Sequence, residues 1–387
     1  MAVRIRPRNE TSTSGNATSL KYWGYQMKKI ISLLLALAMV STLFAACSSE
    51  EPAAKPAATE TKTEDKEAAE VEEKEEAKAE EPAEKIMLRL AETHPGDYPT
   101  TLGDIEFARL VGEKTDGRIT VEVYHSKQLG EEKDVIEQVQ FGAIDFTRVS
   151  VGPMTEFSPE LAVVALPYIY QSADHMWDVL NSEIGDEFLA GLESSNFVGL
   201  GWYDGGARSF YNSVKPIQTL EDLDGLKFRV MQSEMMVDMV EALGASPTPM
   251  AYGEVYSSIQ TGVIDGAENN WPSYDTSSHF EVANYYTLDE HLRVPEILIA
   301  SKIVIDKLSA EDLALIKEAA VESQMYQREL WAAKEKASEA KIREAGNEIY
   351  VLPAEEKARF AEQMKPVWAK HAEGFEDIID AIQAKIK

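Results

Sequence analysis

Short apolar strand patterns alternate with helix patterns after residue 85, and this alternation constrains the fold more than any other feature. A first series predicts strands at 86–92, 119–124 and 143–149 and helices at 100–114 and 131–141. A second series predicts strands at 197–203, 226–231 and 263–268 and helices at 235–243 and 253–262. Such alternation indicates an α/β fold with largely parallel sheets. Two series indicate two lobes around a cleft, with ligands at the carboxyl ends of the strands.

A long helical pattern at about 310–344 follows the two series. Ser309 precedes it as a capping residue, with Glu311 and Asp312 in the first turn, and Gly346 ends it. At ~1.5 Å per residue the helix would measure about 50 Å, enough to brace both lobes. A last strand is expected at 348–352, with helices after it.

The charge of the chain excludes one large class of function. The chain has 67 Asp and Glu against 38 Lys and Arg, which gives a formal net charge of −29. Residues 86–387 alone have a net charge of −26. Nucleic-acid affinity depends on neutralising phosphates with Lys and Arg. We therefore expect no nucleic-acid partner, while the hydrophobic share of 44% excludes wholesale disorder.

Motifs for metal, cofactor or covalent chemistry are absent from the sequence. Cys47 is the only cysteine, so neither an intramolecular disulfide nor a cysteine zinc site can form. The six histidines lack HExxH and His-x-His spacing, and there is no GxSxG, P-loop or GxGxxG motif. We therefore expect no metal, no cofactor and no enzyme activity, although paired acids of the glycosidase type stay open among so many carboxylates.

Residues 1–46 are expected to be an upstream extension and a secretory signal peptide. Residues 1–26 have no apolar period, and Met27 is the better initiator because Lys28 and Lys29 follow it and precede the apolar run 30–46. That run is short for a membrane span, which takes about 20 apolar residues.

The residues around Cys47 predict a lipid anchor. Phe-Ala-Ala-Cys at 44–47 resembles the lipobox of bacterial lipoproteins, in which the cysteine is acylated, although Leu is commoner where Phe44 stands. A plain cleaved signal or a buried thiol is the alternative. Residues 47–85 are then a lipidated cysteine and a disordered acidic tether, since 48–85 hold fourteen acids, six lysines and no aromatic residue. We expect an extracytoplasmic protein anchored to the membrane through Cys47.

Two arginines stand close to apolar strands. Arg229 lies inside the strand 226–231, and Arg208 follows the strand 197–203. A buried guanidinium is costly unless it meets an anion, and its planar fork suits a carboxylate. That anion is either an acid of the protein or the carboxylate of a ligand, and sequence spacing does not separate the two.

Two further polar residues stand at strand exits. Asn269 follows the strand 263–268, where its amide either reads hydroxyl groups of a ligand or serves ordinary turn chemistry. His94 follows the strand 86–92, where a surface histidine is the default interpretation.

Several sequence blocks, in the right order, resemble the extracytoplasmic solute-binding proteins of tripartite ATP-independent periplasmic (TRAP) transporters, the DctP type. The blocks are 128–130 (QLG), 142–146 (GAIDF), 166–168 (LPY), 222–230 (DLDGLKFRV), 244–250 (GASPTPM) and 254–269 (EVYSSIQTGVIDGAEN). The resemblance implies a two-lobed, periplasmic-binding-protein-like (Venus flytrap) fold. It places lobe I at 86–205 plus 295–334 and lobe II at 206–294 plus 335–387.

The resemblance also implies a ligand site. In this family a ligand carboxylate pairs with the strand arginine, here Arg229, and a second arginine and an asparagine assist, here Arg208 and Asn269. The family's cleft-lining positions fall on Glu132, Thr93 and His94. Arg148 belongs to a block, 148–150 (RVS), that resembles the branch for sugar acids such as glucuronate and galacturonate. Further blocks of that branch are 203–208 (YDGGAR), 269–274 (NNWPSY) and 289–296 (DEHLRVPE).

The expected function is therefore capture of a hexuronate and its delivery to a TRAP-type permease in the membrane. A C4-dicarboxylate or another carboxylate is the alternative ligand within the same family. A surface enzyme acting on uronic acids and a sensor that presents its closed form to a signalling receptor are the alternatives of other classes.

Overall fold

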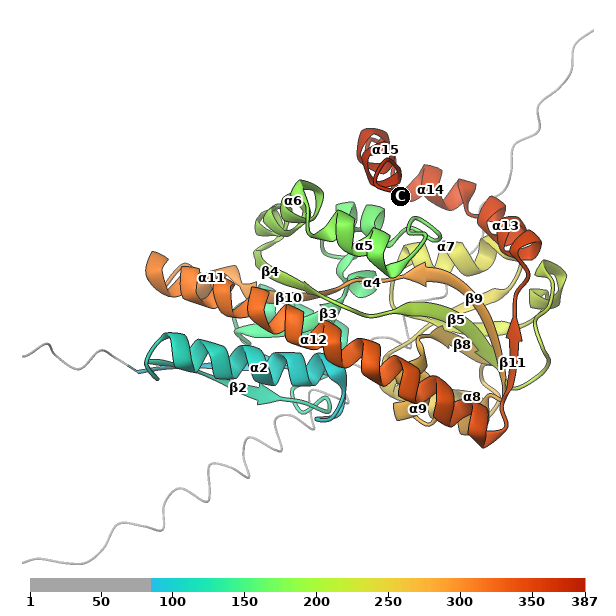
Figure 1. The fold of residues 1–387 in the computed structure, drawn as a ribbon, viewed down its shortest axis with the longest axis horizontal. Coiled ribbons are helices and arrows are strands. Elements are labelled where there is room, and N and C mark those ends of the chain that lie inside the picture. Colours follow the sequence, from blue (N-terminus) through green and yellow to red (C-terminus); the bar gives the residue numbers. More distant parts are fainter. Residues whose placement is uncertain (1–84, 387) are drawn as a thin grey trace, which may run out of the picture. The chain divides into compact units, whose positions relative to one another are not determined.

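Two mixed β-sheets surrounded by helices make up the computed structural model, which describes residues 85–386 (Figure 1). The expected signal peptide, Cys47 and all but the last residue of the tether lie outside the described residues. No helix within 85–386 is both long enough and apolar enough to cross a membrane.

The first sheet has the strand order β2-β1-β3-β10-β4. Its strands are β1 (Ile86–Ala91), β2 (Ile119–Tyr124), β3 (Phe146–Ser150), β4 (Phe197–Tyr203) and β10 (Glu296–Ser301). β1 runs parallel to β2 and β3, whereas β10 runs antiparallel to both of its neighbours.

The second sheet has the order β11-β9-β5-β8-β6-β7. Its strands are β5 (Ala207–Asn212), β6 (Lys227–Val230), β7 (Ser246–Pro249), β8 (Gly266–Asn269), β9 (Tyr285–Arg293) and β11 (Glu348–Val351). β5 runs antiparallel to β8 and β9, and the other neighbouring pairs are parallel.

The expectation of largely parallel sheets is wrong for β5 and β10, whose neighbours are all antiparallel, and for the pairing of β9 with β5, whereas β9 runs parallel to β11. The chain passes directly between the sheets at these strands, through residues 204–206 from β4 to β5 and through 294–295 from β9 to β10. β5 therefore continues β4 and β10 continues β9, and because the two crossings run in opposite directions they pair antiparallel in both sheets. The strand expected at 143–149 begins only at Phe146, because Gly142 adopts a left-handed φ of 74° and opens a turn.

Helices lie around both sheets. They are α2 (Pro99–Lys114), α3 (Glu132–Gln140), α4 (Val151–Met154), α5 (Ala173–Leu180), α6 (Glu183–Gly191), α7 (Glu234–Ala242), α8 (Val255–Gln260), α9 (Trp271–Thr276), α10 (His279–Val282), α11 (Lys302–Ile305), α12 (Ala310–Ala345), α13 (Ala354–Gln363), α14 (Lys365–His371) and α15 (Glu376–Gln383). The expected helices at 100–114, 131–141 and 235–243 correspond to α2, α3 and α7. The helix expected at 253–262 is divided into a 3-10 turn at Tyr252–Glu254 and α8.

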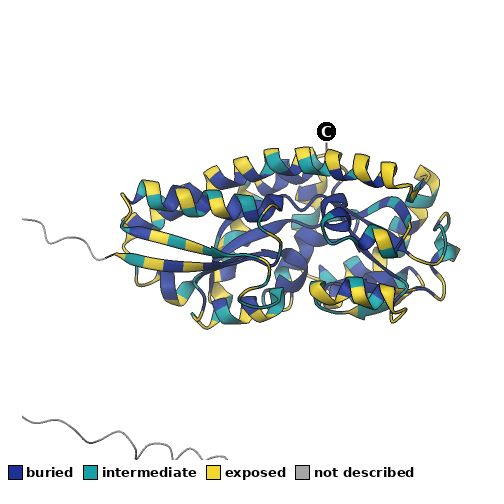
Figure 2. Cartoon of the chain, turned by 90° about the horizontal axis from the view of Figure 1, so that it is seen from below, coloured by how far each residue is buried: buried dark blue, intermediate teal, exposed yellow. Residues whose placement is uncertain are grey.

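The long helix α12 contacts elements on both sides of the cleft, α2 and β4 on one side and α9 on the other (Figure 1). The Ser309 hydroxyl accepts a hydrogen bond from the Asp312 amide at 3.0 Å, and Gly346 ends the helix with a φ of 87°. Figure 2 shows the exposed residues of α12 on its outer face, while the buried ones turn inward. The expected bracing helix is confirmed.

The same turn occurs at equivalent places beside the two sheets. Residues 142–145 (GAID) follow α3, and residues 262–265 (GVID) follow α8. Both glycines are left-handed, with φ of 74° and 72°. The aspartate of each turn accepts a hydrogen bond from a backbone amide of the neighbouring strand, at 2.6 and 2.8 Å. Arg148 and Glu268 therefore occupy matching positions, each on the strand that follows such a turn.

Candidate ligand-binding site

A narrow cavity, here called the inner cavity, lies between β1, β3 and β10 of the first sheet and β5, β6 and β8 of the second. It is lined by Thr93, His94, Tyr98, Glu132, Arg148, Ser150, Arg208, Arg229, Met231, Tyr252, Asn269, Asn270, Ser273 and Glu296. The fold thus brings together the seven residues expected to contact a ligand, although their role in binding stays a prediction. The cavity volume is only about 30 Å³, room for roughly two waters. A larger ligand enters only if the lining moves apart.

Arg229 is a buried cation without an acidic partner. It lies on β6 with 4% of its surface exposed, and its Nε and Nη2 donate to the Met250 carbonyl oxygen at 3.0 and 2.9 Å. Within residues 85–386 it makes no ion pair, and burial lowers its pKa below the ordinary arginine value. Of the two anions that the sequence left open for this arginine, the protein's own carboxylate is therefore excluded in the described chain.

Arg208 shows the opposite arrangement. Its Nε and Nη2 donate to the two carboxylate oxygens of Glu268 at 2.5 and 2.7 Å, and Nη1 donates to Asn269 Oδ1 at 2.8 Å. Burial raises the pKa of Glu268, but Arg208 outweighs it and lowers that pKa to about 2. An acid of the protein thus already neutralises this arginine.

Arg148 lies on the first-sheet wall of the cavity and is surrounded by carboxylates. Its Nε and Nη2 donate to the two oxygens of Glu92, the former at 2.8 Å, and its Nη1 donates to Glu296 at 2.7 Å. Glu132 lies 3.5 Å from the same Nη1. Burial alone would lower the pKa of Arg148, but these acids outweigh burial and raise that pKa well above the ordinary arginine value.

Glu132 and Glu296 share that guanidinium nitrogen and are also held by Ser150. The Ser150 amide donates to Glu132 at 2.7 Å, and its hydroxyl donates to Glu296 at 2.9 Å. Burial raises the pKa of Glu132 to about 7, against the lowering effect of Arg148, and burial also raises the pKa of Glu296. This wall can therefore present both a hydrogen-bond donor and acceptors to the hydroxyl groups of a ligand.

Asn269 lies at the end of β8 beside Arg208. Its Oδ1 accepts from Arg208 and, at 2.9 Å, from the Asn270 amide. Among the described residues its Nδ2 has no hydrogen-bond acceptor, so this donor is free for a ligand that enters the cavity. Both alternatives for Asn269, turn chemistry and ligand recognition, are compatible with this geometry.

His94 and Thr93 lie where β1 ends, and the default of a surface histidine is wrong. The His94 ring stacks on Tyr98 at 3.9 Å between ring centres and meets the edge of Tyr252 at 5.2 Å. Burial, with a contribution from Arg148, lowers the pKa of His94 to about 3. The imidazole is therefore neutral at physiological pH and forms part of the cavity wall.

Sequence reasoning missed half of the cavity lining: Tyr98, Ser150, Met231, Tyr252, Asn270, Ser273 and Glu296. Four of these, Ser150, Asn270, Ser273 and Glu296, stand inside the blocks that resemble the sugar-acid branch. The other three carry no motif.

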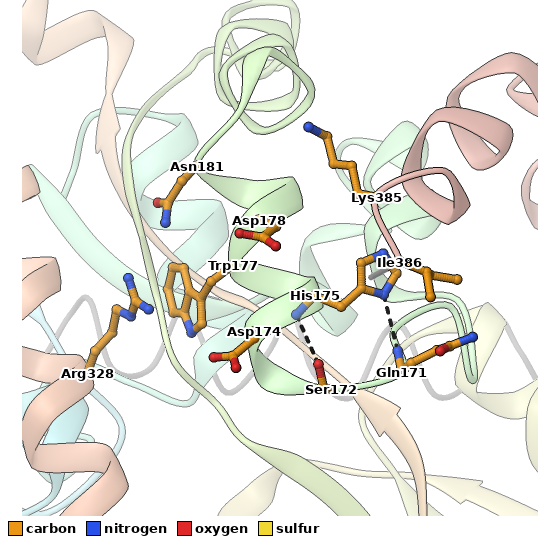
Figure 3. A pocket seen from close by; sticks show the side chains of 10 residues that line it. All are labelled: Gln171, Ser172, Asp174, His175, Trp177, Asp178, Asn181, Arg328, Lys385 and Ile386. Atoms are coloured by element: carbon orange, nitrogen blue, oxygen red, sulfur yellow. Dashed lines mark hydrogen bonds between the residues drawn. The ribbon is translucent and has the colours of Figure 1, made fainter.

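A larger cavity of about 580 Å³ lies elsewhere, between α5, α12 and the C-terminal residues (Figure 3). The Arg328 guanidinium lies 3.8 Å from the ring centre of Trp177, and the Trp177 indole donates to Asp204 at 3.1 Å. None of the expected site residues lines this cavity, and its arginine is already stacked on an aromatic ring. The inner cavity, with its buried and unpaired Arg229, is the better candidate site.

The family model for bacterial extracellular solute-binding proteins, family 7 (DctP), matches residues 90–374. The chain belongs to this family. One family relative, a solute-binding protein of Chromohalobacter salexigens, is 44% identical over 71% of this chain and 81% of its own length. The C4-dicarboxylate-binding periplasmic protein DctP of Rhodobacter capsulatus is 31% identical over 75% of this chain and 88% of its own length.

Solved structures of the family extend the comparison. A TRAP periplasmic solute-binding protein from Bradyrhizobium, crystallised with galacturonate, has a TM-score of 0.75 and 43% identity over 77% of this chain and 99% of its own. A second structure, of a protein from Chromohalobacter salexigens crystallised with D-glucuronate, has a TM-score of 0.74 and 42% identity, and the match covers 77% of this chain and 100% of that protein. The expected family and the two-lobed fold are confirmed.

Proposed function

We propose that this protein captures a hexuronate, such as galacturonate or glucuronate, and delivers it to a TRAP-type permease. The observation that carries the proposal is Arg229, a buried guanidinium that has no carboxylate partner in the described chain. A ligand carboxylate supplies the missing anion, and the fork of the guanidinium binds it through two parallel hydrogen bonds. Homologous proteins that hold galacturonate or glucuronate support this choice over other acids.

The rest of the inner cavity suits the hydroxyl groups of a sugar acid. Asn269 offers a donor from the second sheet, while Glu132, Glu296 and Ser150 offer donors and acceptors from the first. A C4-dicarboxylate would instead bring its second carboxylate toward Glu132 and Glu296, where like charges repel. This charge pattern favours one carboxylate and several hydroxyls, although the relative from Rhodobacter capsulatus carries a C4-dicarboxylate name.

The attraction for the ligand is local. Residues 86–387 carry a net charge of −26, so the long-range field of the protein repels an anion. A guanidinium removed from water acts at close range and in a low dielectric. Lobe I (86–205 plus 295–334) and lobe II (206–294 plus 335–387) are proposed to close over the ligand, and the permease is proposed to recognise the closed form.

The proposal includes a lipid anchor on Cys47, which lies outside the described residues. It includes no catalytic step, and the solute-binding relatives support that. Replacing Cys47 by Ser is expected to move the exported protein from the membrane fraction to the soluble fraction. An unchanged membrane fraction would remove the anchor from the proposal and leave ligand capture standing.

A thermal-shift panel tests the capture of hexuronates. It contains galacturonate, glucuronate, gluconate, succinate, malate and sialic acid. At about 100 times its Kd a ligand stabilises the protein by ~2.7 kcal/mol, which is a readily measured shift. We expect shifts with the hexuronates and none with succinate or malate. Shifts with the dicarboxylates alone would retain the transport role and overturn the proposed ligand class. If NMR showed that the protein converts a uronate into a product, the protein would instead be an enzyme.

A further inference from the structure

A second cavity, here called the vestibule, adjoins the inner cavity. It has a volume of about 230 Å³ and shares Thr93, His94 and Tyr252 with the inner cavity. Its other lining residues come from both sides of the cleft, with Ser126 and Lys127 on one side and Tyr256 and Ser277 on the other. Three side chains thus form the wall between the two spaces.

We propose that the vestibule holds the second sugar residue of a 1,4-linked diuronate, so that the protein captures disaccharides as well as single hexuronates. The inference rests on the proposed function, because the first uronate must occupy the inner cavity. It adds a binding site and extends the ligand class from monosaccharides to disaccharides.

The vestibule lining has the chemistry of a sugar subsite. Tyr252 and Tyr256 offer aromatic faces against which the apolar face of a pyranose packs. Ser126, Thr276 and Ser277 offer hydroxyl groups that donate and accept hydrogen bonds. No Asp or Glu lines the vestibule, whereas Glu132 and Glu296 line the inner cavity. A second anionic sugar therefore meets no lining carboxylate there.

Lys127 supplies a cation for the second carboxylate. Its Nζ lies 3.3 Å from Glu131 in a partly exposed pair, and such pairs contribute little. Ser126 and Lys127 both hold left-handed φ angles, 57° and 62°, which is costly for residues with a Cβ. Backbone hydrogen bonds from their amides to His94 and Glu92, at 2.7 and 3.1 Å, keep this loop at the edge of the cleft. The strained loop thus presents Lys127 to the vestibule.

Arg229 lies close to the wall between the inner cavity and the vestibule, which brings the first sugar close to the vestibule. The guanidinium carbon of Arg229 lies 5.9 Å from the ring centre of Tyr252, which belongs to the shared wall. The carboxylate carbon of a hexuronate is attached to C5, next to C4. We place C4 of a uronate bound to Arg229 on the side of this wall and the ring oxygen on the other side, so that a sugar joined at C4 extends past Tyr252. The small inner cavity already requires its lining to move when a single uronate enters.

Isothermal titration of the full-length protein in detergent tests the inference with galacturonate and 1,4-linked digalacturonate. The variants are Lys127→Met and Tyr256→Ala, with Lys307→Met, an exposed lysine outside both cavities, as the matched control. The wild type is expected to bind both sugars. We expect each vestibule variant to weaken digalacturonate binding about tenfold, as the loss of one charged or aromatic contact predicts, and to leave galacturonate binding within about twofold. The control is expected to change neither.

The outcomes separate the two proposals. Binding of galacturonate without binding of digalacturonate overturns the vestibule inference and leaves hexuronate capture intact. Equal weakening of both sugars by the vestibule variants also overturns the inference, because the residues then act on the whole cleft. Binding of neither sugar overturns the proposed function and the inference with it.

Discussion

The Arg208 guanidinium on β5 donates two hydrogen bonds, of 2.5 and 2.7 Å, to the carboxylate of Glu268 on the adjacent strand β8. Arg229, on the other neighbour of β8, has no such partner within the described chain. The second sheet therefore offers the cavity two arginines of different kinds, one already neutralised by the protein and one whose charge is unmet. Removing the acidic partner of Arg208 is therefore expected to lower stability, whereas removing the Arg229 charge itself is not.

Replacing Glu268 by Gln should destabilise the fold, because it leaves the Arg208 guanidinium buried and unpaired. Breaking one side of a buried ion pair costs about 3 kcal/mol or more. Urea unfolding followed by circular dichroism measures the change. The exposed Glu187→Gln on α6 is the control and is expected to stay within about 0.5 kcal/mol of the wild type. Equal stabilities of the two variants would contradict the role assigned to Glu268.

Replacing Arg229 by Met should abolish ligand binding without lowering stability. The variant removes a buried charge that makes no ion pair in the described chain and for which the attraction of Glu268 does not outweigh burial, so the free energy of unfolding is expected to be unchanged or higher. The ligand carboxylate loses its partner, and we expect a loss of about 3 kcal/mol, or over a hundredfold in Kd. Titration calorimetry and urea unfolding on the same sample measure both quantities. Wild-type affinity in this variant would disprove the site assignment.

Ligand affinity is expected to fall as the pH rises through neutrality. Burial raises the pKa of Glu132 to about 7, above the ordinary value, so this acid is protonated below pH 7 and charged above it. The charged form adds a carboxylate beside Glu296 and Arg148 in a cavity that receives an anion. If only the protonated form binds, affinity falls about tenfold between pH 6 and 8.

Glu132→Gln mimics the protonated acid and provides the control for this pH dependence. Its affinity is expected to stay nearly constant from pH 6 to 8 in titrations of the same uronate. A wild-type profile as flat as that of the variant would show that Glu132 does not titrate with binding.

Stability is expected to decline between about pH 6.5 and 9 because of His291. Burial opposes its charge, but Asp289 at 2.8 Å and Glu268 at 3.5 Å raise its pKa to about 9. A histidine with a raised folded-state pKa contributes stability that is complete below its unfolded pKa and lost as the pH passes the folded one. Urea unfolding at pH 6, 7.5 and 9 measures the decline, which His291→Gln should reduce.

The strand and helix order was predictable because periodicity reports local structure. Strands 119–124 and 197–203 and helix 310–344 lie within a residue of their observed bounds. The strands β5, β7, β9 and β10 were missed. β5 and β10 are buried on both faces and therefore show no alternation, and the register of β9 and β10 depends on partners far along the chain. The direction in which they run follows from the links between the sheets, which no local pattern encodes.

The sequence predicted which types of residue line the site, but it did not predict the partner of each arginine. The resemblance singled out Arg229 for the ligand carboxylate, but spacing alone did not show whether Arg208 or Arg229 meets an acid of the protein. Only the fold brings Glu268 to one of them and the Met250 carbonyl to the other. Tyr252, which separates the inner cavity from the vestibule, begins a 3-10 turn and lies outside the matching sequence blocks, and it was missed for that reason.

The matched positions of Arg148 and Glu268 have a mechanical consequence. Each of these residues forms its ion pairs with partners on its own side of the cleft, Glu92 and Glu296 for Arg148 and Arg208 for Glu268. Across the cavity, neutral groups contact each other: Tyr98 hydrogen-bonds Ser273 at 2.8 Å, and the His94 ring meets the edge of Tyr252. Parting the two walls therefore breaks no ion pair among the described residues around the cavity and weakens only the longer-range attraction between Arg208 and Glu296. The two lobes of the free protein can therefore separate at little electrostatic cost. Under the proposed function, the ligand carboxylate bound to Arg229 is what stabilises the closed form.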